Sequence, residues 1–257
     1  MGRKRTGWRL LATAGLLAVG LAACSSAPAP PDGSAGSVAD RPVPAAIRHL
    51  PLTDQAGRRV TLASWPGRTV VVVPFLTLCA DICPMTTGNL VQVQRALRAD
   101  GAASAVVLVE VTVDPGRDTP GRLAAYARLT GARWPLVTES PAVLRRLAGF
   151  FGFDYRKVPE GQPPDVDWLT HRPLTYDVDH SDGFVVIDPS GVERFVTGGA
   201  PAFHGTLPAA LHRFLSPVGR RHLDHPARPS WTPTDLLDAV GWSMGRALPA
   251  APAGGGS

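Results

Sequence analysis

The sequence predicts an α/β domain in which helices cover both faces of a central mixed sheet. A continuously apolar segment, 70–76, and a largely apolar one, 105–113, have the length and composition of strands that are buried on both faces. Segments with helical start signals or helical spacing of apolar residues follow them, and a hairpin and a further helix come last. This alternation is typical of a sheet that lies between two layers of helices.

A hairpin and a central strand open the domain. The turn at 54–57, with Gly as its last residue, separates apolar segments at 50–53 and 58–62, which predicts the hairpin. The first central strand follows, and we expect it to end or bulge at Pro74, because proline cannot donate a hydrogen bond to a neighbouring strand. Apolar residues at helical spacing then predict a helix over 85–99.

The second half of the domain contains two helices with clear start signals. Thr119 and Ser140 each precede a proline, which is the pattern of an N-cap followed by a first-turn proline. We expect the first of these helices to stop at Gly131 and the second near Gly149. The remaining expected elements are a hairpin, with strands at 184–188 and 193–196, and a closing helix at 207–215.

The N-terminus has the features of a bacterial lipoprotein signal. Four basic residues among the first nine precede an uncharged segment, 10–23, which is short for a membrane span of roughly 20 residues. Leu21-Ala22-Ala23-Cys24 resembles a lipobox, so we expect cleavage before Cys24 and a lipid on its thiol. An uncleaved signal anchor is the alternative, and it too would leave the domain on the extracytoplasmic face of the cell membrane.

These features divide the chain into four parts. We expect a signal peptide at 1–23, a lipidated cysteine with a flexible tether at 24–44, a folded domain at 45–215, and an extension at 216–257 with one candidate helix and a disordered end. The tether is rich in Ala, Pro, Ser and Gly, and would reach on the order of 25 Å. Cleavage lowers the formal net charge from +5 to +1, so we expect no nucleic acid as a partner.

Cys79 and Cys83 are the residues that carry the chemistry. The chain has three cysteines, and the lipid on Cys24 leaves these two as the available pair. They lie between a strand and a helix, where the helix N-terminus lowers the pKa of a thiol. Their spacing differs from that of a thioredoxin motif, and two thiolates are too few for a structural zinc site. Thiolates with one imidazole suit Cu(I), while a structural disulfide or a redox-active dithiol are the alternatives.

His180 is the candidate for the imidazole. It lies directly before the strand 184–188, and the order of elements indicates a thioredoxin-like sheet, in which the loop entering that strand faces the cysteine loop. The alternative is a loop histidine that bonds to Asp179 or another neighbour. His222 and His225 lie in an Arg- and Pro-rich segment that we expect to be a loop without a metal ion.

Three motifs resemble the SCO/SenC family of extracytoplasmic copper-binding proteins. They are, in the family's order, Phe75-Leu76-Thr77-Leu78-Cys79-Ala80-Asp81-Ile82-Cys83-Pro84-Met85-Thr86, Val113-Asp114-Pro115-Gly116-Arg117-Asp118-Thr119-Pro120, and Asp179-His180-Ser181 followed by Ile187-Asp188-Pro189-Ser190-Gly191. The resemblance implies a thioredoxin-like fold and copper, as Cu(I) or Cu(II), bound by Cys79, Cys83 and His180. For the middle motif we expect a structural turn beside the site.

The resemblance also implies the partners. They are the membrane, reached through the lipidated N-terminus, the copper-bearing subunit of cytochrome c oxidase, a copper donor and a thiol reductant. We expect a chaperone that supports assembly of the copper A centre of that oxidase, rather than an enzyme. The alternatives are a thiol–disulfide reductase that uses Cys79 and Cys83 as its catalytic pair on the cysteines of the oxidase copper site, and a redox or copper sensor.

Overall fold

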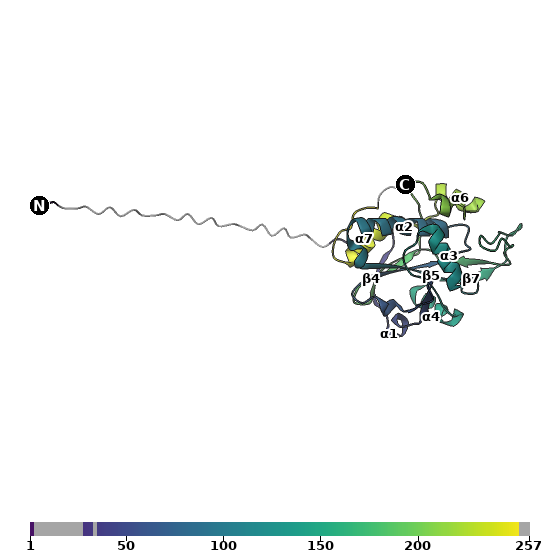
Figure 1. Cartoon of the computed structure of the whole chain (residues 1–257), viewed down its shortest axis with the longest axis horizontal. Coiled ribbons are helices and arrows are strands. Elements are labelled where there is room, and N and C mark those ends of the chain that lie inside the picture. Colours follow the sequence, from purple (N-terminus) through teal and green to yellow (C-terminus); the bar gives the residue numbers. More distant parts are fainter. Residues whose placement is uncertain (3–27, 33–34, 252–257) are drawn as a thin grey trace.

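The computed structural model describes residues 1–2, 28–32 and 35–251 (Figure 1). Cys24 and all but the first two residues of the expected signal peptide lie outside the described residues, as does the expected disordered end from 252 onward. None of the described helices is long and apolar enough to cross a membrane.

An eight-stranded mixed sheet forms the centre of the domain, in the order β1-β10-β9-β4-β5-β6-β2-β3. β4 pairs with β5 and β5 with β6 in parallel, whereas the other neighbouring pairs are antiparallel. The strands are β1 (Ser37–Pro42), β2 (Leu52–Asp54), β3 (Arg59–Val60), β4 (Thr69–Phe75), β5 (Val106–Thr112), β6 (Leu136–Thr138), β9 (Phe184–Ile187) and β10 (Val192–Thr197). Two smaller ladders join β7 (Tyr155–Val158) to β8 (Asp177–His180) and β11 (Ala200–Pro201) to β12 (Ser230–Trp231).

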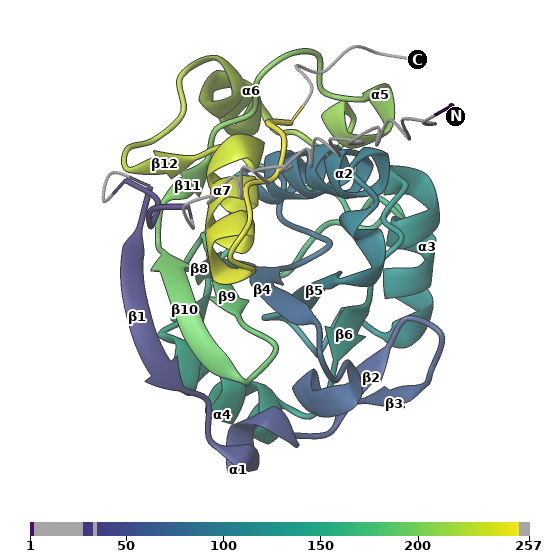
Figure 2. The ribbon, with the colours of Figure 1, turned by 90° about the vertical axis from the view of Figure 1, so that its left-hand side faces the viewer.

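Helices cover both faces of the sheet, as the sequence predicts. In Figure 2, α2 and α7 lie across one face while α1 and α4 lie on the other. The helices are α1 (Ala45–Arg48), α2 (Cys83–Ala99), α3 (Pro120–Thr130), α4 (Pro141–Phe151), α5 (Ala209–His212), α6 (Pro217–Asp224) and α7 (Pro233–Ser243), with 3-10 turns at Leu62–Ser64 and Ala102–Ser104. The unit β4-α2-β5, followed by the hairpin β9-β10 and by α7, is the arrangement of a thioredoxin-like fold.

Most of the predicted helix start and stop signals coincide with the observed helix ends. The Thr119 side chain accepts a hydrogen bond from Arg122 N–H at the start of α3, and Gly131 ends that helix with φ +77°. α4 continues past Gly149 and ends at Gly152, whose φ is +75°. The later glycine ends the helix because it adopts the left-handed conformation that closes the last turn.

Pro74 does not interrupt β4, contrary to the expectation from sequence. It pairs in regular register with Val111 of β5. Phe75 O accepts from Val113 N–H on the β5 side, so the backbone of Pro74, one residue earlier, faces the opposite side. On that opposite side, the pairing of β4 with β9 stops at Val72. No neighbouring strand therefore faces the position where proline lacks an N–H.

Both ends of the folded domain lie further out than the expected 45–215. β1, which pairs with β10, lies inside the segment expected to be a tether. It is an edge strand with almost every side chain exposed, so it carries no apolar pattern. At the other end, Trp231, Leu237 and Val240 are 0% exposed and belong to the core beneath α2 and α7. The described part of the extension, 216–251, therefore contributes to the folded domain.

Glu110 is a buried carboxyl in the middle of β5. It accepts hydrogen bonds from Thr87 Oγ1 at 3.0 Å and from Trp134 Nε1 at 2.8 Å. Thr87 lies one helical turn after Cys83, so these bonds fix the first turns of α2 against the sheet. Burial raises the pKa of Glu110 to about 7, although the two hydrogen bonds act in the opposite direction.

The substitution Glu110→Gln should flatten the dependence of stability on pH. The carboxyl binds its proton more tightly in the folded chain, because its pKa rises from an ordinary 4.5 to about 7. Its contribution to stability is therefore greatest in acid and is lost as the pH rises from about 5 to 8. Urea unfolding across this range should show the variant gaining up to ~3 kcal/mol on the wild type toward pH 8.

Glu139→Gln is the matched control. Partial burial opposes ionisation of Glu139, but Ser140 N–H and Arg59 outweigh it and lower the pKa of that carboxyl. It stays ionised above pH 5, so this variant should keep the slope of the wild type. An unchanged slope in Glu110→Gln would contradict the account of the buried carboxyl.

Candidate metal centre

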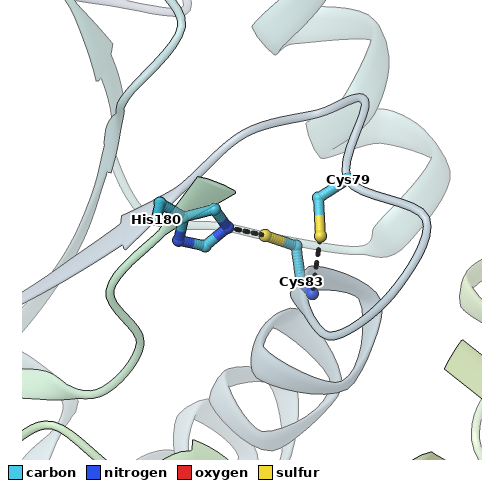
Figure 3. A group of neighbouring side chains, drawn as sticks. All are labelled: Cys79, Cys83 and His180. Atoms are coloured by element: carbon cyan, nitrogen blue, oxygen red, sulfur yellow. Dashed lines mark hydrogen bonds between the residues drawn. The ribbon is translucent and has the colours of Figure 1, made fainter. Parts of the chain in front are cut away.

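Cys79, Cys83 and His180 come together at the end of β4 (Figure 3). One ligand atom from each, two sulfurs and an imidazole nitrogen, all lie within 4.8 Å of one another. Cys83 Sγ lies 3.5 Å from His180 Nε2 although the two residues are 97 positions apart, and Cys83 N–H points to Cys79 Sγ at 3.5 Å. Both cysteines are free thiols. The structure thus brings together the three residues that the sequence singles out.

The elements around the site explain this convergence. Cys83 is the first residue of α2, and Pro84 occupies the first turn, where a missing N–H costs nothing. On the histidine side, Gly183 has φ +102°, and a Cβ there would lie 1.9 Å from Thr197 O. Only glycine fits this turn. It leads the chain from His180 at the end of β8 into β9, close to the point where β9 leaves β4.

The imidazole of His180 is held in a metal-binding orientation. Its Nδ1 lies 2.8 Å from Ser181 O. A carbonyl can only accept, so Nδ1 carries the hydrogen. The other ring nitrogen, Nε2, faces Cys83. A second hydrogen-bond partner of this kind fixes the tautomer of a ligating histidine. Burial lowers the pKa of His180, but its hydrogen bond and charge interaction with Cys79 outweigh burial and raise it to about 9.

The two thiols have opposite acidities. The hydrogen bond from Cys83 holds the pKa of Cys79 well below its usual value, and His180 adds to this effect against the cost of burial. Burial and the neighbouring Cys79 raise the pKa of Cys83 well above its usual value. Cys79 is also partly exposed, whereas Cys83 is 1% exposed. Without a metal ion, Cys79 is therefore the more acidic of the two thiols.

The buried carboxylate of Asp118, in the loop between β5 and α3, holds the cysteine loop, which is the segment 76–82 between β4 and α2. Asp118 accepts from Thr77 N–H at 3.2 Å, from Thr77 Oγ1 at 2.5 Å and from Thr112 Oγ1 at 2.6 Å. Trp168 Nε1 donates to Thr77 O at 2.8 Å, so the residue two positions before Cys79 is fixed through three of its polar atoms. Burial raises the pKa of Asp118 to about 6.

The loop between β5 and α3, which carries Asp118, also holds the histidine side of the site. Arg117 pairs with Asp114 and donates to Tyr176 O at 2.7 Å, and its guanidinium lies 3.8 Å from the centre of the Tyr176 ring. The Tyr176 hydroxyl donates back to Asp114 at 2.9 Å. Tyr176 directly precedes β8, which ends at His180. The motif at 113–120, expected to be a structural turn, thus supports both halves of the centre.

The centre opens into a cleft of about 580 Å³. Cys79, His180 and Asp182 line it, together with residues of β8 and of α6. Burial raises the pKa of Asp182 to about 7, and its Oδ1 lies 3.7 Å from His180 Nδ1. Asp182 has no distinguishing signal in the sequence, because it closely follows two other aspartates, Asp177 and Asp179.

His222 lies against the cysteine loop, a contact that nothing in the sequence indicates. Its Nδ1 is 2.6 Å from Asp81 Oδ1. The segment around it is the helix α6 rather than the expected loop, and Ser216 caps this helix by accepting from Gly219 N–H at 3.1 Å. Ser216-Pro217 is the same start signal as Ser140-Pro141, so the helix itself is visible in the sequence.

The donor set fits a soft monovalent metal ion. Two sulfurs and one imidazole nitrogen match the ligand preference of Cu(I), and no carboxylate belongs to the described group of three. Ligand atoms within 4.8 Å of one another need only small shifts to reach one ion. The thiols are already reduced and Nε2 of His180 is already directed at them.

Comparison with known proteins gives a family and a set of relatives. The family model SCO1/SenC matches residues 40–201, more than half of the chain. The mitochondrial SCO2 homologue of Bos taurus is 30% identical over 141 residues, which cover 55% of this chain and 49% of that protein. A relative from Stutzerimonas stutzeri that is named for copper binding is 30% identical over 149 residues, covering 58% and 67%. The chain thus spans about half the length of the mitochondrial relative it matches.

A solved structure agrees with the fold. A crystal structure of a protein from Aquifex aeolicus VF5 aligns with a TM-score of 0.53 at 18% identity, and the alignment covers 82% of this chain and 96% of that one. At this identity the likeness concerns the fold alone.

Alkylation should distinguish the two cysteines. With iodoacetamide at pH 6.5, the metal-free reduced protein should be modified at Cys79 at least about tenfold faster than at Cys83, because the thiolate is the nucleophile and Cys79 is partly exposed. Peptide mapping by mass spectrometry measures both rates. His180→Ala should slow modification of Cys79 at this pH, since His180 lowers its pKa. Equal rates, or faster modification of Cys83, would contradict the assignment.

Proposed function

Because the chain belongs to the SCO1/SenC family, we propose that it is a membrane-anchored copper chaperone that supports assembly of the copper A centre of cytochrome c oxidase. It binds one copper ion through Cys79, Cys83 and His180. The observation that carries this proposal is the convergence of these three side chains within 4.8 Å at the end of β4. The copper-binding relative in Stutzerimonas stutzeri supports the choice of metal.

The residues of the centre suit a cargo that must be released again. Cys79 is the more acidic thiol in the metal-free state and gives up its proton more readily, while Cys83 loses its proton as the ion binds. His180 presents Nε2 as soon as it is neutral. Cys79 and His180 line the open cleft, so a thiol of a recipient protein can approach the ion from there and replace one ligand at a time.

Membrane attachment is the second part of the proposal. A lipid on Cys24 holds the domain at the extracytoplasmic face of the cell membrane, and the copper-bearing oxidase subunit, a copper donor and a thiol reductant act there as partners. The tether between Cys24 and β1 is shorter than the expected 24–44, since β1 begins at Ser37. The lipobox sequence Leu21-Ala22-Ala23-Cys24 supports this placement.

Copper titration of ligand variants tests the proposal. The reduced protein should bind about one Cu(I), and Cys79→Ala, Cys83→Ala and His180→Ala should each lower its affinity by at least about 100-fold, because even neighbours of metal ligands often contribute 10–100-fold. Competition with a chromophoric Cu(I) chelator measures the affinity. The exposed His225 provides a control, since His225→Ala should bind like the wild type. Equal affinity in a ligand variant would refute the assignment.

The copper affinity should also fall as the pH is lowered. Protons compete for the thiolates and the imidazole. The pKa of His180 is about 9 in the metal-free protein, so competition at this ligand begins already below about pH 9. Repeating the titration between pH 6 and pH 9 should show affinity rising throughout, and a pH-independent affinity would contradict a centre made of these ligands.

The acidity difference between the thiols favours a second candidate function, thiol–disulfide exchange. The Cys79 thiolate would attack a disulfide of the oxidase copper site, forming a mixed disulfide and releasing one target thiolate. Cys83, after losing its proton, would then displace the second target sulfur and close a Cys79–Cys83 disulfide. A thiol reductant would return two electrons to that disulfide.

His180→Ala separates the two functions in cells. A chaperone loses its third copper ligand, so the oxidase should contain much less copper A, whereas exchange chemistry keeps both of its cysteines and is only slowed, because His180 lowers the pKa of Cys79. The measurement is copper content and activity of oxidase purified from cells that carry the variant, with Cys79→Ser as the reference for complete loss. Full copper loading in His180→Ala, together with loss in Cys79→Ser, would favour the reductase.

A further inference from the structure

The helix α6 (Pro217–Asp224) contacts the loop that separates the two cysteines. Just before its first turn, Ser216 N–H donates to Ala80 O at 2.7 Å. On the same side, His222 Nδ1 lies 2.6 Å from Asp81 Oδ1. A carboxylate only accepts, so the imidazole donates here, and a hydrogen bond to a charged acceptor is stronger than one between neutral groups.

The backbone of α6 lies directly on the loop. A Cβ on Gly219 would be 2.6 Å from Ala80 O and 2.7 Å from Asp81 O, so only glycine permits this approach. The remaining loop residue, Ile82, packs in the same apolar cluster as Leu223. Ala80 and Asp81 therefore each have a direct partner in the segment 216–222, and Ile82 shares an apolar cluster with the end of α6.

The loop relies on these contacts because, among the described residues, the amides of Ala80, Asp81 and Ile82 donate no hydrogen bond, and only the two cysteine amides are bonded on this stretch. Cys79 N–H reaches Leu76 O at 3.4 Å, and Cys83 N–H reaches Cys79 Sγ at 3.5 Å. α6 itself is held at both ends. Leu215, directly before Ser216, is 3% exposed, and Trp231 after the helix is 0% exposed, with its ring 5.1 Å from that of Phe184.

We propose that α6 is a positioning element of the metal centre, with Gly219 and His222 as the positioning residues that keep the two thiols at ligand separation before copper arrives. The inference deepens the proposed copper function and rests on it. The conformational freedom of the loop is then lost when the chain folds rather than when the ion binds, which raises affinity. The helix α6 lies beyond the residues 40–201 that match the family model. The proposed positioning role therefore belongs to the extension of this chain.

The test compares variants on one helix. His222→Ala removes the donor to Asp81, and His222→Asn restores it, because the amide nitrogen of asparagine can take the place of Nδ1. His225→Ala is the control, as His225 follows the same helix and is exposed. The first readout is made on the metal-free reduced protein: NMR order parameters of the Ala80, Asp81 and Ile82 amides and hydrogen exchange of the Ser216 amide. The second is Cu(I) affinity together with the thiolate-to-Cu(II) absorption band.

The expected results follow from a loosened loop. In His222→Ala the order parameters should fall toward those of a flexible segment, below about 0.6, and the Ser216 amide should exchange about tenfold faster, as for the loss of one charge-assisted hydrogen bond. Cu(I) affinity should fall about tenfold at unchanged stoichiometry, and the absorption band should shift. His222→Asn should recover these values, and His225→Ala should match the wild type.

A second variant and the metal-free readout keep the outcomes distinct. Gly219→Ala pushes α6 away from the loop by steric contact and should produce the same loosening without altering any polar group. Unchanged order parameters and exchange in both His222→Ala and Gly219→Ala would overturn the positioning role. If the wild type failed to bind one Cu(I), the proposed function would fall, while the metal-free measurements would still judge the role of α6.

Discussion

The loop between β5 and α3 is the constraint on which the site depends, because it holds together two segments of chain that lie almost a hundred residues apart. Asp118 binds the cysteine side through Thr77, and the Asp114–Arg117 pair binds the histidine side through Tyr176. A buried carboxylate is costly unless its oxygens are satisfied, and Asp118 meets that condition with three donated hydrogen bonds. A change in this loop would therefore move the sulfur and nitrogen ligands relative to each other without touching any of them.

Much of the fold and the ligand set can be predicted from the sequence, for reasons that are local. β4 and β5 are buried on both faces and so consist mainly of apolar residues, and Thr119-Pro120 and Gly131 mark α3 by capping chemistry. The three ligands are predictable because few residue types bind soft metals and the chain offers few of them. Pro74 misleads, since the meaning of a proline in a strand depends on whether a neighbouring strand reaches it, which the sequence of β4 alone does not show.

The parts that escape prediction are those whose partners are remote and polar. β1 is an exposed edge strand that exists because β10 offers a free edge. His222 is 141 residues from Asp81, and nothing in either local sequence indicates the pairing. The residues that make such contacts do not recur in the sequence with the period of a helix or of a strand, so no pattern marks them. They arise only once the core has folded, and here the extension contributes Trp231 and Val240 to that core.

The position of the first strand has a consequence for how the protein would search for a partner. Ser37 lies level with Val196, Val185 and Val72 across the sheet, which is the middle of β4, the strand whose last residue, Phe75, is followed by the cysteine loop. A lipid at Cys24 would leave the ten residues 25–34 before Ala35, which is already buried in the core, and ten residues span at most about 35 Å. The centre would then stay within a thin layer above the bilayer, together with any partner in the same membrane. Under such confinement, even a weak encounter between the two proteins would suffice for transfer.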